Sequence, residues 1–135
     1  MITGGCLCGC VAWRLDGPVA VINHCHCSMC RKIHGAAFGT FAHASARAFG
    51  WERGEEATTR YESSPGIWRS FCRVCGSGVP VIEGDEVSIP AGGIDGDPGV
   101  RPSVHIFTGS KAPWYSIADD LPQFEHFPPE DFWPS

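Results

Sequence analysis

Cysteine is the residue type in this 135-residue chain most able to do chemistry, and all eight cysteines fall into three short groups. These groups are Cys6-Leu7-Cys8-Gly9-Cys10, Cys25-His26-Cys27-Ser28-Met29-Cys30 and Cys72-Arg73-Val74-Cys75-Gly76. Cysteines two or three positions apart in a turn can direct their sulfur atoms at one ion, and thiolates are common zinc ligands in closed sites. Zinc is therefore the first hypothesis for these groups.

Disulfides are the alternative, and the cellular compartment decides between the two. Residues 1–6 contain no basic region followed by an apolar stretch, so no export signal is expected and we predict a cytoplasmic protein. The cytosol keeps thiols reduced, which favours metal binding over disulfides. A disulfide could still form within the second group if its metal were lost.

The third group supplies half of a closed site. Cys72 and Cys75 form a two-thiolate knuckle, and Gly76 permits the backbone turn that follows it. A tetrahedral site needs a second pair, for which Cys6 and Cys8 are the natural candidates. In a flat strand the two side chains would lie about 6.6 Å apart. Two sulfur atoms on one zinc lie about 3.8 Å apart, so the chain must bend there.

The resulting prediction is a structural zinc held by Cys6, Cys8, Cys72 and Cys75. Such a site would join the N-terminus to the middle of the chain and contribute much of the folding free energy. The alternative is that Cys6 and Cys8 are buried thiols and only the knuckle binds metal.

The second group, Cys25, Cys27 and Cys30, offers three ligands on one short segment. This pattern is typical of a zinc that keeps its fourth position open, so these three residues are the predicted catalytic group. Three thiolates on a divalent cation leave a formal charge of −1, which makes a poor generator of hydroxide. The site suits a soft, exchangeable fourth ligand such as a substrate thiolate, and therefore indicates thiol chemistry rather than hydrolysis.

Four other residues could close this second site and make it structural instead. They are Cys10, His24, His26 and His34, although a histidine near a metal more often supports the ligands from outside. Cys10 itself is expected to be a buried small hydrophobic residue, two positions along a strand from Cys8.

Short strands joined by turns are expected to position these groups. Apolar runs predict strands over residues 11–15, 19–23, 38–41, 49–51, 58–61 and 104–108, and a hairpin over residues 81–89. A helix is predicted over residues 28–34, with Ser28 as its N-cap and Gly35 at its end. Pro80 indicates an edge strand. Residues 91–102 are expected to form a loop, and the tail from Pro122 to wrap the body in irregular structure. The sequence thus predicts one mainly β domain over residues 1–135.

Composition excludes several functions. Fifteen acidic residues against ten basic ones give a net charge of −5, which argues against a dedicated nucleic-acid binder. No apolar run approaches the roughly 18 residues of a membrane span, so no membrane association is expected.

The order of the motifs resembles that of a known family. The matching segments are Gly4-Gly5-Cys6-Leu7-Cys8-Gly9, His24-Cys25-His26-Cys27-Ser28-Met29-Cys30-Arg31-Lys32, Phe71-Cys72-Arg73-Val74-Cys75-Gly76, His105-Ile106-Phe107, Ala112-Pro113-Trp114 and Leu121-Pro122-Gln123-Phe124. Together they are similar to the glutathione-dependent formaldehyde-activating enzyme family, which also includes centromere protein V. The chain departs from the usual pattern at Cys10, where a small non-thiol residue is expected.

The resemblance implies an Mss4-like fold of several coiled antiparallel sheets with short helical turns. It also implies two zinc ions per chain, a closed one on Cys6, Cys8, Cys72 and Cys75 and an exchangeable one on Cys25, Cys27 and Cys30. The implied activity is that of a carbon–sulfur lyase, which condenses formaldehyde with glutathione to S-hydroxymethylglutathione. Because the family includes a centromere protein, the alternative is a non-catalytic zinc-binding scaffold or interaction module.

Glutathione carries two carboxylates, which need basic partners. Arg31 and Lys32 follow Cys30 directly and are the predicted substrate contacts, with an ordinary solvated helix face as the alternative. Arg69 and Arg73 are expected to serve only solubility. Packing in the core or at its rim is expected of four tryptophans, Trp13, Trp51, Trp68 and Trp114.

Overall fold

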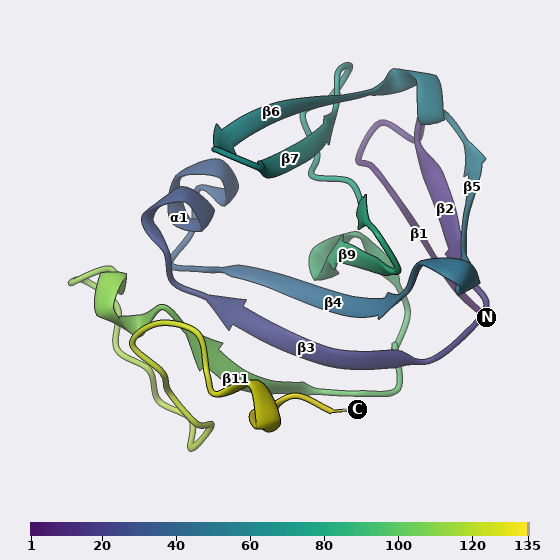
Figure 1. Ribbon diagram of the computed structural model, residues 1–135. Coiled ribbons are helices and arrows are strands. Elements are labelled where there is room, and N and C mark those ends of the chain that lie inside the picture. The colour runs from purple at the N-terminus through teal and green to yellow at the C-terminus, as the bar shows by residue number, and fades with distance from the viewer. Residues whose placement is uncertain (135) are drawn as a thin grey trace.

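The computed structural model describes residues 1–134 and shows eleven strands in three sheets, with one α-helix among those residues (Figure 1). The strands are β1 (Ile2–Gly5), β2 (Ala12–Leu15), β3 (Val19–Cys25), β4 (Gly39–Ser45), β5 (Phe49–Arg53), β6 (Thr58–Ser64), β7 (Ile67–Cys72), β8 (Val81–Glu83), β9 (Glu86–Pro90), β10 (Ile94–Asp95) and β11 (Pro102–Ile106). The helix is α1 (Ser28–His34), and single 3-10 turns cover Ala46–Ala48, Glu55–Ala57, Ala91–Gly93, Thr108–Ser110 and Glu130–Phe132.

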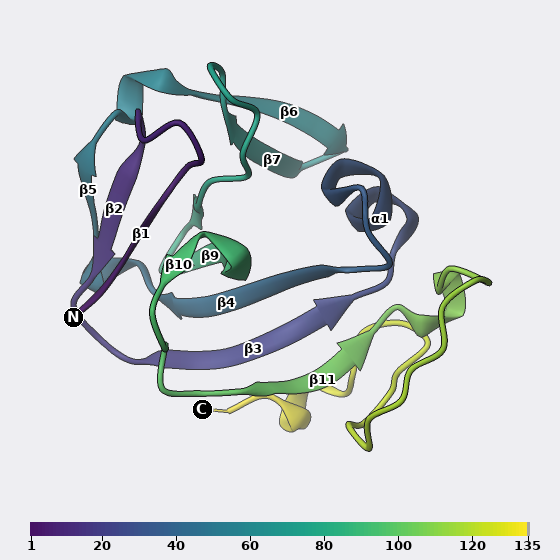
Figure 2. The same cartoon turned by 180° about the vertical axis from the view of Figure 1, so that it is seen from behind.

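The largest sheet has the order β11-β3-β4-β9-β8 and carries the second cysteine group at one end. The antiparallel sheets expected from the sequence are present, and the pairs of this sheet are antiparallel except for β11 and β3, which are parallel. The parallel pairing is possible because β3 and β11 are joined by a long path through the other strands, which returns the chain to the end of the sheet where β3 begins (Figure 2).

Two smaller sheets stand at opposite ends of β3 and β4. The sheet β10-β1-β2-β5 lies at the end where the N-terminus enters, and the β6–β7 hairpin lies beside α1 (Figures 1 and 2). The main core fills the space between the first and the largest sheet. Its buried residues are Trp13, Leu15, Val19, Ile22, Ala42, Ala44, Val87 and Ile89. This core leaves the cysteine groups at its margins, where turns rather than strands can shape them.

Most of the elements predicted from the sequence are present. The strand predictions correspond to β2, β3, β4, β5, β6 and β11, and the hairpin to β8 and β9. Pro80 immediately precedes β8, which is an edge strand as expected. The tail follows the outer side of β11 in irregular structure, where its backbone bonds to His105 through Pro122 O and Phe124 N, at 2.9 and 3.0 Å.

The helix bounds are confirmed, but its cap is not the expected residue. Cys27, not Ser28, is the N-cap, and the Cys27 sulfur accepts the backbone N–H of Cys30 at 3.3 Å. Gly35 ends the helix in the left-handed conformation, as predicted. Because a sulfur satisfies the helix terminus, the same side chain orders α1 and faces its two neighbouring cysteines.

Two candidate metal centres and a buried histidine relay

The first and third cysteine groups meet in one cluster. The sulfur atoms of Cys6, Cys8, Cys72 and Cys75 all lie within 4.8 Å of one another. Two of the separations are 3.6 Å for Cys6 to Cys8 and 3.8 Å for Cys8 to Cys72. A tetrahedral ion with metal–sulfur bonds of about 2.3 Å needs sulfur separations of about 3.8 Å, so the cluster fits zinc.

The bend expected around Cys8 is present. β1 ends at Gly5, residues 7 and 8 form a turn, and Gly9 adopts a positive φ of 83°. On the opposite side, Gly76 has a φ of 80° and its N–H bonds to the Cys72 carbonyl at 2.8 Å. Both knuckles therefore depend on a glycine in a conformation that other residues rarely adopt.

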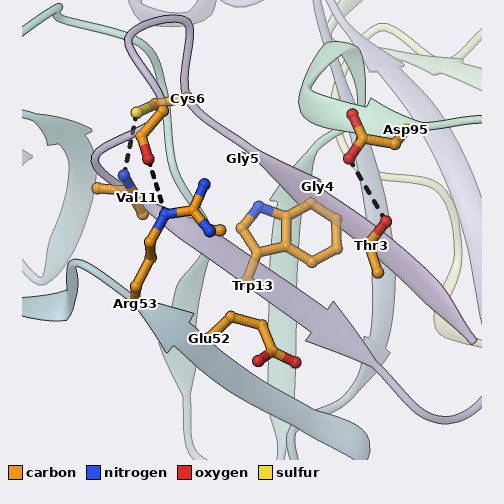
Figure 3. Close-up of a pocket in the computed structure, with 11 residues that line it drawn as sticks. Thr3, Gly4, Gly5, Cys6, Val11, Trp13, Glu52, Arg53 and Asp95 are labelled. Atoms are coloured by element: carbon orange, nitrogen blue, oxygen red, sulfur yellow. Dashed lines mark hydrogen bonds between the residues drawn. The ribbon is translucent and has the colours of Figure 1, made fainter.

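Hydrogen bonds hold this four-cysteine cluster from several sides. The Val11 N–H donates to the Cys6 sulfur at 3.2 Å, and the Ser77 hydroxyl lies 3.3 Å from the Cys75 sulfur. Arg53 of β5 donates to the Gly9 carbonyl at 2.9 Å, beside a shallow cavity floored by Trp13 (Figure 3). The contacts of Val11 and Ser77 lower the pKa of Cys6 and Cys75 and so favour their thiolates, as a cation site requires.

The second group forms a separate three-cysteine cluster. The sulfur atoms of Cys25, Cys27 and Cys30 lie within 4.8 Å of one another, at the end of β3 and the first turn of α1. Cys25 and Cys30 are buried, whereas Cys27 is partly exposed. The neighbouring thiols hold the pKa of Cys27 far below its ordinary value and raise that of Cys25, because one thiolate discourages a second. A bound cation would remove this conflict, and three soft donors with one open side fit zinc.

Arg69 is part of this cluster, so its assignment to solubility alone is wrong. Its guanidinium is half-buried on β7 and donates to the Cys30 sulfur at 3.3 Å. A second donor, Nε, lies 3.2 Å from the Ser63 hydroxyl, which fixes the side chain. The β6–β7 hairpin thus places a permanent positive charge beside three thiols, at a distance of 39 residues from Cys30 in the sequence.

A relay of two buried histidines and an exposed aspartate supports the same cluster from behind. His26, between two of the cysteines, is fully buried and its Nε2 lies 2.8 Å from Nδ1 of His105 on β11. Nε2 of His105 in turn lies 3.0 Å from a carboxylate oxygen of Asp119. The backbone N–H of His26 also donates to the Ile106 carbonyl at 2.9 Å. β11 and the segment after it therefore hold His26, which lies between Cys25 and Cys27, through both its side chain and its backbone.

The acceptor at the end of the relay fixes its proton positions. A carboxylate only accepts, so His105 donates through Nε2 and accepts through Nδ1 from Nε2–H of His26. Burial, reinforced by His105, lowers the pKa of His26 to about 4, which keeps that ring neutral. Nδ1 of His26 is then a buried acceptor without a partner in the described chain.

A groove of about 780 Å³ opens onto the three-cysteine cluster and is lined by Cys25, Cys27, Cys30 and Arg69 among others. Arg31 and Lys32, the predicted substrate contacts, do not line this groove. Their role stays a prediction.

The other single residues had mixed outcomes. Cys10 is exposed, not buried, because residues 9 and 10 form a bend before β2 begins, so the chain there is not a strand. Trp13 and Trp51 pack in the core as expected, whereas Trp68 lines the groove beside the three-cysteine cluster. Trp114 is 71% exposed, so the packing expected of it is wrong.

The fold and these two clusters define a class: small, mainly β proteins that gather cysteines from distant turns into sites able to hold metal ions. The sequence model described as "Glutathione-dependent formaldehyde-activating enzyme" matches residues 1–110. The chain belongs to this family.

Individual relatives agree with that placement. A protein of Halomonas elongata named "Putative glutathione-dependent formaldehyde-activating enzyme" is 33% identical over 131 residues, which covers 87% of this chain and 81% of that protein. Among solved structures, a crystal structure of a Rhodobacter sphaeroides protein is similar, with a TM-score of 0.56 and 26% identity. That similarity covers 74% of this chain and 91% of the other.

No helix in residues 1–134 is both long and apolar enough to cross a membrane.

Proposed function

We propose that this chain is a zinc-dependent carbon–sulfur lyase that forms or cleaves an adduct between glutathione, or a similar thiol, and formaldehyde. In the forward direction the thiol sulfur bonds to the carbonyl carbon, the C=O π bond breaks, and the thiol proton ends on the oxygen. The product of this addition is S-hydroxymethylglutathione. The proposal includes a single Mss4-like domain over residues 1–135 and a reducing, cytoplasmic location that keeps the cysteines available.

The observation that carries the proposal is the three-cysteine cluster with its open side facing a groove. Zinc held by Cys25, Cys27 and Cys30 would supply a soft electrophile that binds a substrate thiol as its thiolate. The cluster of Cys6, Cys8, Cys72 and Cys75 would hold a second, structural zinc, because its four donors leave no open position.

The protein's own residues prepare the thiol site in two ways. Arg69 lies against the Cys30 sulfur and so offsets negative charge where a further thiolate would enter. The groove presents its apolar walls to the entering sulfur and limits its contact with water. The charge of Arg69 stabilises a bound anion, and the apolar walls favour a soft, weakly hydrated thiolate over a hydroxide, in agreement with addition rather than hydrolysis.

Titration calorimetry with glutathione and S-methylglutathione tests the proposal on protein carrying two zinc ions. Glutathione should bind at least about tenfold more tightly and release one proton, visible as a dependence of the enthalpy on the buffer. S-methylglutathione has no thiol proton to release and serves as the matched control. Protein that binds glutathione should also accelerate formation of S-hydroxymethylglutathione, followed by NMR exchange.

The alternative function is a non-catalytic zinc-binding scaffold of the same fold. It predicts that no low-molecular-weight thiol binds and that no adduct forms faster than in buffer. Those results would contradict the lyase proposal.

The histidine relay gives a separate prediction about zinc affinity. Replacing Asp119 with Ala should leave the buried Nε2–H of His105 without an acceptor and loosen the His26 backbone between Cys25 and Cys27. We expect the three-cysteine site to lose roughly 10–100-fold in zinc affinity, the range seen when outer partners of metal ligands are removed. Competition with a chromophoric chelator measures this.

Two further variants separate positioning from a general loss of stability. Asp119→Asn retains an acceptor oxygen and should recover most of the affinity. Asp120→Ala removes a neighbouring exposed carboxylate and should change nothing. Equal zinc affinity in Asp119→Ala and the unmodified chain would show that the relay does not position this site.

A further inference from the structure

The groove beside the three-cysteine cluster is far larger than formaldehyde requires. Its volume of about 780 Å³ lies in the upper part of the range for small-molecule sites, roughly 300–1,000 Å³. β3 and β4, α1, the β6–β7 hairpin and the tail all contribute to its walls. A one-carbon carbonyl compound would leave most of this space to water.

The walls of the groove are mainly apolar next to the cluster. Phe41, Ile106 and Phe107 belong to the same packed group as Cys25 and Cys30. Ile33, Ile67 and Trp68 face the groove from α1 and β7. Such walls stabilise an apolar substituent by removing it from water.

Fixed charges are few and unevenly placed. Among the described residues that line the groove, Arg69 is the one permanent cation, and it lies at the cysteines. Glu83 and Glu86 lie at the far side, on the β8–β9 hairpin. Burial lowers the pKa of His43, so that ring adds no positive charge at neutral pH. The two carboxylates of glutathione would find one cation, beside the cysteines, and acidic groups at the other end of the groove, so the peptide does not suit the interior.

The tail, which lies beyond residue 110 where the match to the family model ends, completes the apolar wall. Trp133 packs against the group that contains Cys25 and Cys30, and Phe127 stacks edge-on against Phe107 at 4.8 Å. Phe107 is the single described non-glycine residue with a positive φ, 56°, a strained conformation that needs local compensation. The family model ends its match at residue 110, so these tail aromatics are features of this chain beyond that match.

We propose that this groove binds the apolar part of the carbonyl partner, so that the preferred adduct is a hemithioacetal of glutathione with an alkyl or aryl aldehyde. The inference rests on the proposed function for the identity of the thiol. The chemistry is unchanged: the sulfur–carbon bond forms, the C=O π bond breaks, and the thiol proton ends on the oxygen. The aldehyde substituent, absent in formaldehyde, occupies the groove.

Binding of two thioethers to the zinc-loaded protein tests the inference without turnover. S-hexylglutathione and S-methylglutathione share the peptide and differ only in their apolar chain. A fully buried methylene is worth about fourfold in affinity, so the hexyl compound should bind about tenfold or more tightly even with partial burial. Equal affinities would overturn the proposal.

Variants in the tail locate the effect. Phe127→Ala and Trp133→Ala should each reduce the hexyl-to-methyl affinity ratio by about threefold or more, the equivalent of about one methylene. Trp114→Ala is the matched control, because Trp114 is an exposed tryptophan after β11 that does not line the groove. Zinc content and melting temperature confirm that each variant is folded, and a ratio unchanged in both groove variants would contradict the assignment.

The two proposals fail in different ways. Proton release on glutathione binding together with equal thioether affinities would leave the lyase proposal standing and overturn the groove assignment. A hexyl preference that depends on Phe127 and Trp133, without proton release by glutathione, would support the apolar site and contradict the thiol chemistry.

Discussion

Cys27→Ser protein should remain folded, contain one zinc ion instead of two and form the glutathione adduct only at the uncatalysed rate. Serine keeps an oxygen that can accept the Cys30 N–H, so the cap of α1 survives the substitution. A hydroxyl stays protonated at neutral pH and is a poor zinc ligand, which leaves two donors at the site. Cys27 is not part of the main core, so the substitution should reduce metal binding without unfolding the protein.

Metal analysis measures the zinc content of Cys27→Ser, circular dichroism measures its folding, and NMR exchange measures its rate of adduct formation. Cys10→Ser is the matched control, because Cys10 is an exposed thiol outside both clusters and its replacement should retain two zinc ions and full activity. A Cys27→Ser protein that keeps two zinc ions would remove Cys27 from the ligand set. Unfolding of the variant would instead make this a second structural site.

The grouping of the cysteines could be predicted from the sequence because each ligand pair lies within one local turn. Spacing alone places Cys72 beside Cys75, and the surrounding glycines allow the bend that brings Cys6 to Cys8. Tetrahedral geometry then demands that two half-sites join. No comparable rule exists for Cys10, whose exposure depends on where β2 begins.

The supporting residues could not be predicted because they come from other elements. Arg69 reaches Cys30 across 39 positions, and His105 reaches His26 across 79. Neither pair leaves a local pattern in the sequence. His105 and Asp119 are 14 positions apart, and their contact cannot be recognised before the positions of β11 and the following segment are known.

In the fold, too, the features set by local sequence could be predicted, and those set by contacts between distant segments could not. Strands with alternating apolar residues were predictable, whereas β1 was missed because its sequence, Ile2–Gly5, contains two glycines. The structure gives one reason for them: a side chain at Gly4 would overlap the ring of Trp13 on the paired strand β2. The parallel pairing of β11 with β3 depends on the path of a long connection, which composition does not encode.

Cys75→Ser should have the opposite effect to Cys27→Ser and abolish the stable fold. Its cluster links positions 64 residues apart, Cys8 and Cys72, so the bound metal would close a long loop between the N-terminal turn and the middle of the chain. Because metal binding to such a site is coupled to folding, we expect a loss on the order of 5 kcal/mol, comparable with the whole stability of a small domain.

The choice of Cys75 separates metal loss from damage to packing. Cys72 is fully buried against Val11, Ala57 and Val79, so its replacement would disturb the core as well. Cys75 is only partly buried, and a serine of similar size fits there. Urea denaturation of zinc-loaded protein, with Cys10→Ser as the control, measures the difference.

Removal of metal from the unmodified chain should show the same difference between the two clusters: loss of one zinc should leave the protein folded, and loss of the other should unfold it. A chelator added stepwise should take the zinc of the three-cysteine site first, with no change in circular dichroism, because three protein donors hold the ion there and four hold it in the other cluster. Loss of the second zinc should coincide with unfolding. If Cys75→Ser stays soluble and cooperative with two zinc ions, or if the chelator removes both ions from a protein that remains folded, then the four-cysteine cluster does not stabilise the fold.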